Sequence, residues 1–302
     1  MSVSNVPTAD RDVSPIAPGT SASLAIPQLV DRYGGRLRAV ALRMCRHRAD
    51  ADDLVQDVFL QAFRRWSTFR GEADPGTWLY AIAARACGRR RKGGVDRRMP
   101  AVSQLMPWRE TTVMEAAAAP AGDESPAERR EALDRVQAEI ARLPEHLRVP
   151  VVLKEVLGVS VEETASALAL SENTVKTRLH RARLALRKAM TARAAAVPAP
   201  APIYDKQVCL DLLKAKMDAM DRGGTAAGFV VPQAEVCARC RAVFRELDLV
   251  QDACAKMSEG SLPVALRASI MRAIRERDAD EQTRPRKRGR RPVRASARVV
   301  RR

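Results

Sequence analysis

Four of the six cysteines lie in the last third of the chain, at a spacing that suits metal binding. Cys237 and Cys240 form a C-x2-C pair, which can place two thiolates on one tetrahedral ion. Cys209 and Cys254 flank this pair, so that the full pattern is C-x27-C-x2-C-x13-C. If zinc is bound, we expect these four thiols to be its ligands, and we expect no required cofactor. The same thiols also fit a disulfide formed under oxidant, or metal-free packing as buried side chains.

The remaining reactive side chains do not form a catalytic group. His47, His146 and His180 stand apart from one another in the sequence. No Ser/His/Asp or Cys/His nucleophile set, glycine-rich phosphate loop or pair of catalytic carboxylates stands out. The sequence therefore predicts a protein that is not an enzyme. Cys45 and Cys87 lie in a helical segment, where a thiol is most simply a small buried side chain.

The composition indicates a soluble protein whose positive charge is concentrated in its tail. The 302 residues carry 53 Lys and Arg against 36 Asp and Glu, and residues 284–302 hold ten of these cations and no acid. No apolar stretch is long enough to cross a bilayer, and residues 1–27 lack the pattern of a signal peptide. We therefore expect a cytoplasmic protein without a membrane span, whose cysteines form no structural disulfides.

Helical periodicity with weak β-signals predicts an all-α fold built from small domains. Seven of the eleven aromatic residues lie between positions 33 and 80, which points to one compact unit there. The expected divisions are a disordered arm (1–24), a helical domain (25–95), a linker (96–126), a second helical domain (127–190), an Ala/Pro linker (191–204), a small helical cysteine-containing module (205–258), and a helix with a basic disordered tail (259–302).

The second helical domain contains the pattern of a helix-turn-helix. Ser160 and Glu163 match a capping box at the start of a short helix, and Ser171 starts a longer one. On the longer helix we expect Val175, Leu179, Ala182 and Leu186 to face inward. Its other face carries Lys176, Thr177, His180, Arg181, Arg183, Arg187 and Lys188. A basic second helix after a tight polar turn fits DNA binding, although such a helix can also be an ordinary solvated surface.

Two stretches of the sequence resemble two regions of one protein family, and they occur in the same order as in that family. The run LPEHLRVPVVLKEVLGVSVEETASALALSENTVKTRLHRARLALRK (143–188) resembles region 4 of the extracytoplasmic-function (ECF) RNA polymerase sigma factors. The run DADDLVQDVFLQAFRRWSTFRGEADPGTWLYAIAARACGRRRK (50–92) is similar to their region 2. With flanking helices the match covers roughly 28–95 and 127–190.

The resemblance implies a sigma factor that directs promoter recognition and DNA melting as a monomer within the holoenzyme. In the family, region 2 binds a coiled coil of the largest polymerase subunit and captures the opened −10 element. Region 4 binds the −35 element as duplex and also the polymerase flap. The expected partners are therefore core RNA polymerase and promoter DNA. The alternative interpretation is a stand-alone helix-turn-helix regulator that binds operator DNA without polymerase.

The resemblance also assigns candidate residues. Those expected to bind core polymerase are Asp52, Asp53, Leu54, Gln56, Asp57 and Phe59. Those expected at the −10 element are Trp66, Phe69, Arg70, Gly71, Asp74, Tyr80, Arg89, Arg90, Arg91 and Lys92. Those expected at the −35 element are Ser171, Asn173, Thr174, Lys176, Thr177, His180 and Arg181.

The aromatic residues of the first domain have two competing roles. An unpaired strand needs flat stacking surfaces and a basic track, but most aromatic side chains at helical spacing belong to a core. We expect Phe59, Phe63 and Trp78 inside. Of Trp66, Phe69 and Tyr80, we expect only some to face DNA.

Residues 191–302 are an addition to the family pattern. They are similar to a zinc-binding anti-sigma domain, whose pattern is a distant Cys followed by H-x3-C-x2-C, but Gln233 occupies the His position. A tethered module of this kind would meet regions 2 and 4 at high effective concentration. We hypothesise autoregulation by residues 205–258, with a separate anti-sigma factor as a further candidate partner. The basic tail is expected to contact nucleic acid non-specifically.

Overall fold

The structure is a computed structural model, and it describes residues 16–45, 47–90, 105–109, 111–114, 126–191, 196–223 and 236–283. Within these ranges nearly every regular element is a helix, which confirms the predicted all-α fold. The predictions made for Arg91, Lys92, Gln233 and the basic tail 284–302 lie outside the described residues. For Arg89 and Arg90, only the backbone is described.

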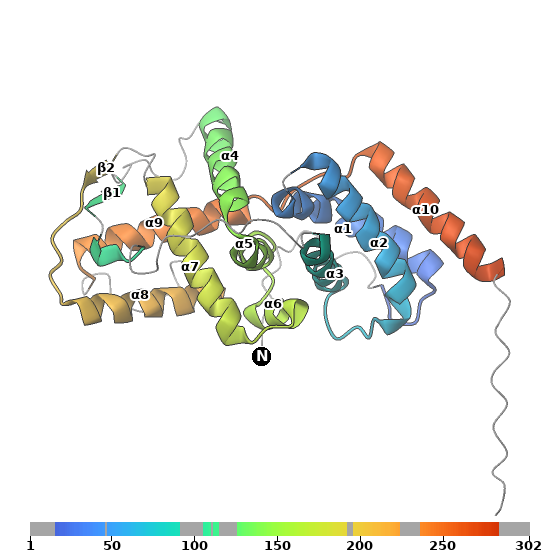
Figure 1. Cartoon of the computed structure of the whole chain (residues 1–302), viewed down its shortest axis with the longest axis horizontal. Helices are drawn as coiled ribbons and strands as arrows, with labels where there is room; N and C mark the ends of the chain where they lie inside the picture. Colours follow the sequence, from blue (N-terminus) through green and yellow to red (C-terminus); the bar gives the residue numbers. More distant parts are fainter. Residues whose placement is uncertain are drawn as a thin grey trace, which may run out of the picture.

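The first domain consists of α1 (Ala22–Met44), α2 (Arg48–Arg65), the short η1 (Trp66–Thr68) and α3 (Pro75–Arg90). The three long helices pack against one another (Figure 1). Their contact surface is apolar because each helix contributes fully buried leucines, which are Leu29 and Leu37 of α1, Leu54 of α2 and Leu79 of α3. The first helix begins at Ala22, slightly before the predicted end of the N-terminal arm.

The second domain consists of α4 (Pro126–Arg142), α5 (Glu145–Val151), η4 (Val152–Val156), α6 (Val161–Leu168) and α7 (Glu172–Thr191). Proline lacks a backbone N–H, and directly after Pro150 the helix widens into the π-helical turn η4. Gly158 comes next with a φ of 72°, a left-handed conformation that ends the helix. The predicted capping box is present, because Ser160 and Glu163 bond to each other's backbone N–H.

The C-terminal part consists of α8 (Lys206–Asp221), α9 (Ala238–Ala255) and α10 (Val264–Thr283). A short helix η3 (Pro107–Arg109) and two strands, β1 (Thr112–Met114) and β2 (Ala196–Pro198), lie beside α8 and α9 (Figure 1). The strands pair antiparallel, with Val113 opposite Val197. They come from the two segments predicted as linkers, so parts of both linkers are structured. Each strand is too short to give a period-two signal in the sequence.

The C-terminal helices share their cores with both domains. Cys254 of α9 and Ile270 and Ile274 of α10 belong to the same buried cluster as the first and second domains. A second cluster joins Leu184 of α7 to apolar side chains of α8 and α9. Helices α8, α9 and α10 are therefore packed onto the rest of the protein.

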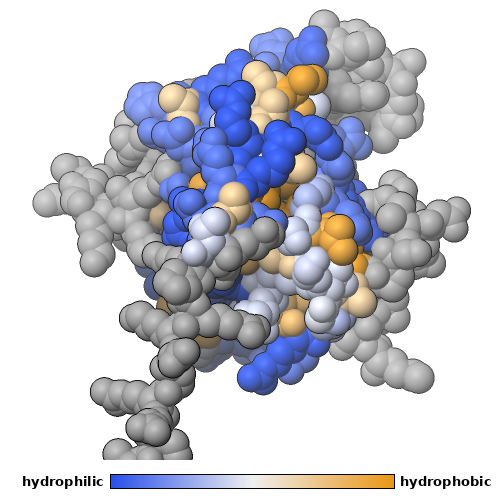
Figure 2. Space-filling view, turned by 90° about the vertical axis from the view of Figure 1, so that its right-hand side faces the viewer, coloured by the Kyte–Doolittle hydropathy of each residue, from blue (hydrophilic) through white to orange (hydrophobic). Residues whose placement is uncertain are grey.

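Helices α9 and α10 lie at opposite ends of the molecule (Figure 1). Helix α9 contacts η4 and α7, whereas α10 contacts α1 and α2. Hydrophilic side chains dominate the outer surface at the α10 end, with small hydrophobic areas between them (Figure 2). Among the helices that the structure describes, none combines the length and apolar character needed to cross a membrane.

Candidate nucleic-acid interface

Helices α6 and α7 form the predicted helix-turn-helix. The turn between them passes through Ala169, whose φ of 54° is left-handed. At the start of α7, the Ser171 hydroxyl accepts a hydrogen bond from the Thr174 backbone N–H at 3.3 Å. Ser171, Asn173 and Thr177 are exposed, and Thr174 and Lys176 are half-buried. The first turns of α7 are thus accessible to a duplex, with backbone N–H groups available for a phosphate.

The inward face of α7 agrees with the sequence prediction, but its outward face does not. Val175, Leu179, Ala182 and Leu186 are buried as predicted. Arg183 and Arg187 were expected on the exposed face and are instead fully buried. This prediction was wrong because segments distant in the sequence cover the second half of the helix.

The two buried arginines of α7 are paired with carboxylates. Arg183 donates to Glu155 of η4 at 2.5 and 2.9 Å and to Asp221 of α8 at 2.6 Å. Arg187 donates to Glu246 of α9 at 2.9 Å. Burial alone would lower the pKa of Arg183, but Glu155 and Asp221 raise it above its ordinary value. Pairing of this kind is what makes a buried cation tolerable.

The remaining candidates for the −35 element are partly covered. His180 is partly buried, and its Nε2 lies 3.4 Å from Asp221 Oδ2. Arg181 is also half-buried. Of the predicted set, the residues at the start of α7 are therefore the more accessible ones, and α8 approaches His180.

The candidate polymerase-binding residues of α2 divide into exposed and buried groups. Asp53 is exposed, and Gln56 and Asp57 are half-buried. Asp52 accepts a hydrogen bond from Arg38 Nε of α1 at 2.7 Å.

Leu54 and Phe59, two further candidates on α2, are fully buried in the core. In this arrangement they hold α2 in place and cannot touch a partner. Their assignment as contact residues is corrected accordingly.

The aromatic candidates for strand capture are inside the first domain. Trp66, Phe69 and Tyr80 are all buried, so the prediction that some of them face DNA is not met in this arrangement. Trp66 stacks on Phe69 with ring centroids 4.9 Å apart, and Trp78 meets both rings. Burial also raises the pKa of Tyr80 well above its usual value. Trp66, Phe69 and Trp78 thus pack ring against ring as part of the core.

The predicted burial of the other three aromatic residues is confirmed for two of them and partly for the third. Phe59 and Phe63 are buried, while Trp78 is partly buried against the core.

The loop that carries the −10 candidates Arg70, Gly71 and Asp74 lies at the start of α3 and is braced on α1. The Asp74 carboxylate accepts hydrogen bonds from the Tyr33 hydroxyl at 3.0 Å and from the Gly76 backbone N–H at 2.7 Å. Gly71 has a left-handed φ of 76°. Arg70 is exposed.

The N-terminal segment lies against this loop. The indole N–H of Trp66 donates to the Thr20 carbonyl at 2.6 Å, and a Cβ added at Gly71 would lie 2.5 Å from Pro18 Cγ.

The two domains touch directly. Arg85 of α3 donates through Nε to the Ala167 carbonyl at the end of α6, at 3.0 Å. A cation at this position stabilises the negative end of the α6 dipole. The first helix of the helix-turn-helix is therefore fastened to the first domain.

The connection between α9 and α10 fits closely onto α1. A Cβ added to Gly35 would lie 2.2 Å from the Gly260 carbonyl oxygen, which shows how near the two backbones come. Beyond this contact, Arg267 of α10 donates two hydrogen bonds to Asp31 of α1, at 2.7 and 3.0 Å.

Helix α10 then runs beside α2. A cavity of about 540 Å³ between the two helices is lined by Asp57, Leu60, Gln61, Arg64, Arg65 and Arg277.

Three of the four candidate metal-binding cysteines are brought together. Cys209 of α8 and Cys240 of α9 have their sulfur atoms 3.8 Å apart. Cys237 is the N-cap residue of α9. Burial alone would raise the pKa of the Cys237 thiol, but backbone hydrogen bonds, the largest from Cys240, lower it.

Cys254 does not join the other three. It lies fourteen residues beyond Cys240 on the same helix, which corresponds to about 21 Å. It is buried in the larger core cluster, near Arg43 and Glu155. The structure therefore separates Cys254 from Cys209 and Cys240, so these thiols cannot all bind one ion in this arrangement. Cys45 and Cys87 are buried, as predicted.

A helix-turn-helix whose second helix is accessible at its start is joined here to another helical domain. This combination is typical of DNA-binding proteins that act in transcription. Comparison with known proteins gives the family. Residues 29–94 match the family model Sigma-70 region 2, and residues 133–186 match Sigma-70, region 4.

Two curated relatives illustrate the similarity. The ECF RNA polymerase sigma factor SigM of Mycobacterium tuberculosis is 32% identical over 163 residues, covering 54% of this chain and 75% of the relative. RNA polymerase sigma factor CarQ of Myxococcus xanthus is 36% identical over 163 residues, covering 52% and 84%. The chain belongs to the ECF family of RNA polymerase sigma factors.

Among solved structures, the chain is similar to CnrH in complex with the cytosolic domain of CnrY. The identity is 25% and the TM-score is 0.40, with 58% of this chain and 94% of that chain covered.

Proposed function

We propose that this sigma factor binds core RNA polymerase, directs promoter recognition and DNA melting, and is restrained by its own C-terminal part. The polymerase supplies the catalysis. The observation that carries the proposal is that one C-terminal segment packs on both functional helices, with α9 against α7 and α10 against α2. A tethered segment of this kind competes with outside partners at high effective concentration.

The −35 element is assigned to the start of α7. Ser171, Asn173, Thr174, Lys176 and Thr177 are at least half-accessible there, and side chains in the first turns of a recognition helix reach base edges. His180 and Arg181 would join them once α8 moves away. Movement of the C-terminal part would also free Arg183 from Asp221 and Arg187 from Glu246, which adds positive charge to this helix.

The −10 element is assigned to the α3 side of the first domain. Arg70, Gly71 and Asp74 form the accessible loop, and Arg89 and Arg90 end α3. Arg91 and Lys92 continue this basic run in the sequence. The buried positions of Trp66, Phe69 and Tyr80 imply that these rings shape the loop unless the domain rearranges on DNA.

The exposed face of α2 is assigned to the binding of core polymerase. Asp53 and Asp57 lie one turn apart on this face, with Asp52 and Gln56 beside them. A paired acidic surface of this kind suits a basic partner. Asp57 also lines the cavity next to Arg277 of α10, so α10 lies beside the proposed docking face.

The cysteine cluster has three proposed states. Cys209, Cys237 and Cys240 are buried, and the sulfur atoms of Cys209 and Cys240 lie 3.8 Å apart; a tetrahedral zinc site built on them would need a ligand beyond these three. Cys254 is too distant to provide it, and position 233 lies outside the described residues. The three states are a bound zinc ion, a disulfide between Cys209 and Cys240, and metal-free packing. The metal content and the number of free thiols of the purified chain distinguish them.

The proposed place of action is the cytoplasm, as a monomer within the holoenzyme. Because the chain carries its own inhibitory segment, a separate anti-sigma factor is a second partner rather than a required one.

The test is reconstitution with core polymerase and mapping of the transcript starts. We compare the full chain with a chain ending at Met190 and with one ending at Glu259, which loses α10 but keeps α8 and α9. The proposal expects start-site selection by all three and higher activity from the shortened chains. Equal activity would overturn the autoregulation. Tight promoter binding without polymerase, together with no effect on start sites, would favour the stand-alone regulator.

A further inference from the structure

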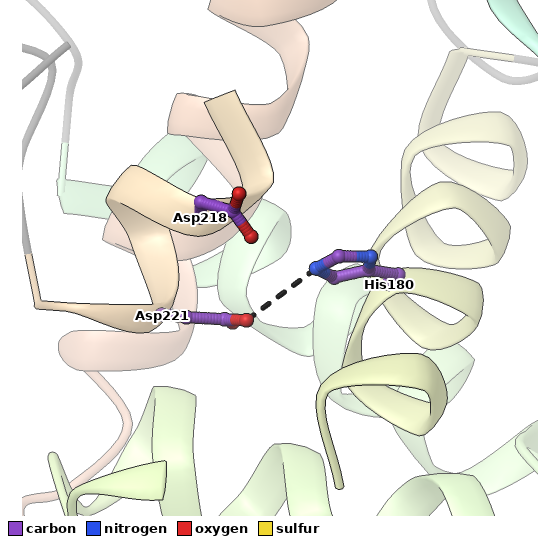
Figure 3. A group of neighbouring side chains, drawn as sticks. All are labelled: His180, Asp218 and Asp221. Atoms are coloured by element: carbon purple, nitrogen blue, oxygen red, sulfur yellow. Dashed lines mark ion pairs between the residues drawn. The ribbon is translucent and has the colours of Figure 1, made fainter. Parts of the chain in front are cut away.

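A group of three side chains between α7 and α8 has the composition of a metal site. His180 of α7 and Asp218 and Asp221 of α8 place one ligand atom each within 4.8 Å of one another. The two aspartates are three residues apart, so they share one face of α8. Figure 3 shows both carboxylates directed toward the His180 ring.

The burial of this group points to a ligand. The Asp221 side chain is only 3% exposed. Its Oδ2 atom and His180 Nε2 are both buried; within the described residues they face each other as an ion pair, and neither makes a hydrogen bond. The two atoms lie 3.4 Å apart. Two ligand atoms of a tetrahedral ion with bonds of about 2.0–2.1 Å are separated by about 3.4 Å, so the spacing suits a shared ion.

The surrounding charges also favour a cation. Arg183 Nη1 holds the other oxygen of Asp221 at 2.6 Å, which fixes the carboxylate and leaves Oδ2 directed at His180. Arg183 is itself paired with Glu155. Three carboxylates (Asp218, Asp221 and Glu155) face two cations (Arg183 and Lys154), so the net negative charge of the surroundings favours a bound cation.

We propose that His180, Asp218 and Asp221 bind a divalent first-row transition-metal ion that fastens α8 to the recognition helix. One imidazole and two carboxylates suit such an ion. The site is distinct from the cysteine cluster, because Cys209 lies twelve residues before Asp221 on α8, a distance of about 18 Å.

The regulatory meaning rests on the proposed function. His180 is a candidate contact for the −35 element, and a metal ion bound to it would keep it on the C-terminal part. The metal-bound chain is then the closed chain, and removal of the ion loosens α8 from α7.

The test is titration of the reduced full chain with Mn²⁺, monitored by the electron paramagnetic resonance signal of the free ion. Mn²⁺ is chosen because it prefers carboxylate to thiolate ligands, so the cysteines do not compete. We expect one bound ion per chain and a loss of affinity of about tenfold or more in Asp218→Asn and His180→Gln. Modulation of the spin echo by a ring nitrogen should appear and should vanish in His180→Gln.

Asp211→Asn is the matched control. Asp211 is an exposed residue of α8 that accepts a hydrogen bond from Gln207, so this variant makes the same chemical change on the same helix away from the group. It should bind Mn²⁺ like the unaltered chain. Absence of binding by the unaltered chain, or equal binding by all variants, overturns the inference. Start-site selection with core polymerase is measured separately, so a chain that initiates transcription but binds no Mn²⁺ refutes the metal site alone.

Discussion

Arg187 of the recognition helix and Glu246 of α9 form an ion pair at 2.9 Å in which both side chains are almost completely buried. The two residues belong to segments that the sequence divides into different modules. Each charge offsets the desolvation of the other in the interior. The interface between region 4 and the C-terminal part is thus specified by charge as well as by apolar packing.

The first prediction concerns this pair. Glu246→Gln should lower the free energy of unfolding of the full chain by about 3–5 kcal/mol, because it removes the buried negative charge that Arg187 Nη1 contacts at 2.9 Å. Urea denaturation measures the change. The double variant Arg187→Met with Glu246→Leu should recover most of the loss, since an apolar pair replaces the ionic one. Glu259→Gln, at an exposed position, serves as the control, and an equal effect there would contradict the interpretation.

The second prediction separates the stability of α1 from the docking of the C-terminal segment. Gly35→Ala should stabilise α1 by about 1 kcal/mol through its helix propensity. The new Cβ would meet the Gly260 carbonyl at 2.2 Å and displace the segment that leads to α10. We expect increased transcription with core polymerase and no loss of the fold of region 2, measured by run-off transcription and circular dichroism.

Gly260→Ala is the matched variant from the opposite side. Its Cβ would lie 2.8 Å from both the Ala39 Cβ and the Gly35 carbonyl oxygen, and it does not alter α1. Both variants should therefore activate. Wild-type activity in both would show that this contact does not restrain the sigma factor.

The third prediction arises from the burial of Tyr80. Because burial raises its pKa, the folded chain keeps the phenolic proton at pH values where the unfolded chain, with a pKa near 10, releases it. Stability should therefore fall as the pH rises above about 10, by up to about 1.4 kcal/mol per pH unit from this residue. Tyr80→Phe should remove this part of the slope in urea denaturation between pH 8 and 11. Tyr204→Phe, at an exposed position, should leave the slope unchanged.

The fourth prediction tests the assignment of the −35 element to α7. Lys176→Ala should weaken promoter binding by the reconstituted holoenzyme by about 1–3 kcal/mol if Lys176 contacts a base, and Arg181→Ala should do the same. The loss should disappear on a template with an altered −35 element. Lys214→Ala on α8 is exposed and serves as the control. Loss of polymerase association instead would mean that α7 has a different role.

The sequence predicted local features well because their causes are local. The inward stripe from Val175 to Leu186 and the capping box at Ser160 depend on neighbours within one or two turns. The exposure of Arg183 and Arg187 was mispredicted because their partners are as many as 59 residues away along the chain. No periodicity of α7 itself could reveal a partner at that distance.

The same difference between local features and contacts with distant segments applies to the candidate sites. The helix-turn-helix could be located from spacing alone, and so could the pairing of Cys237 with Cys240. Trp66 and Phe69 could not be placed, because an aromatic side chain at helical spacing serves a core and a stacking surface equally well. The approach of Asp218 and Asp221 to His180 depends on how α8 docks, which no short motif encodes.

Strand β1 belongs to the segment that connects the two DNA-binding domains, and β2 belongs to the segment that follows the second domain. The short pairing of β1 with β2 joins these two segments. The backbone N–H of Met114 at its end is also held by Glu246, at 2.7 Å. Spreading the two domains along a promoter would have to pull residues 105–114 away from α9. The described part of this tether, residues 105–109 and 111–114, is therefore bound to α9, and under the proposed autoregulation it is released only when α9 moves away, which would make opening a single cooperative event.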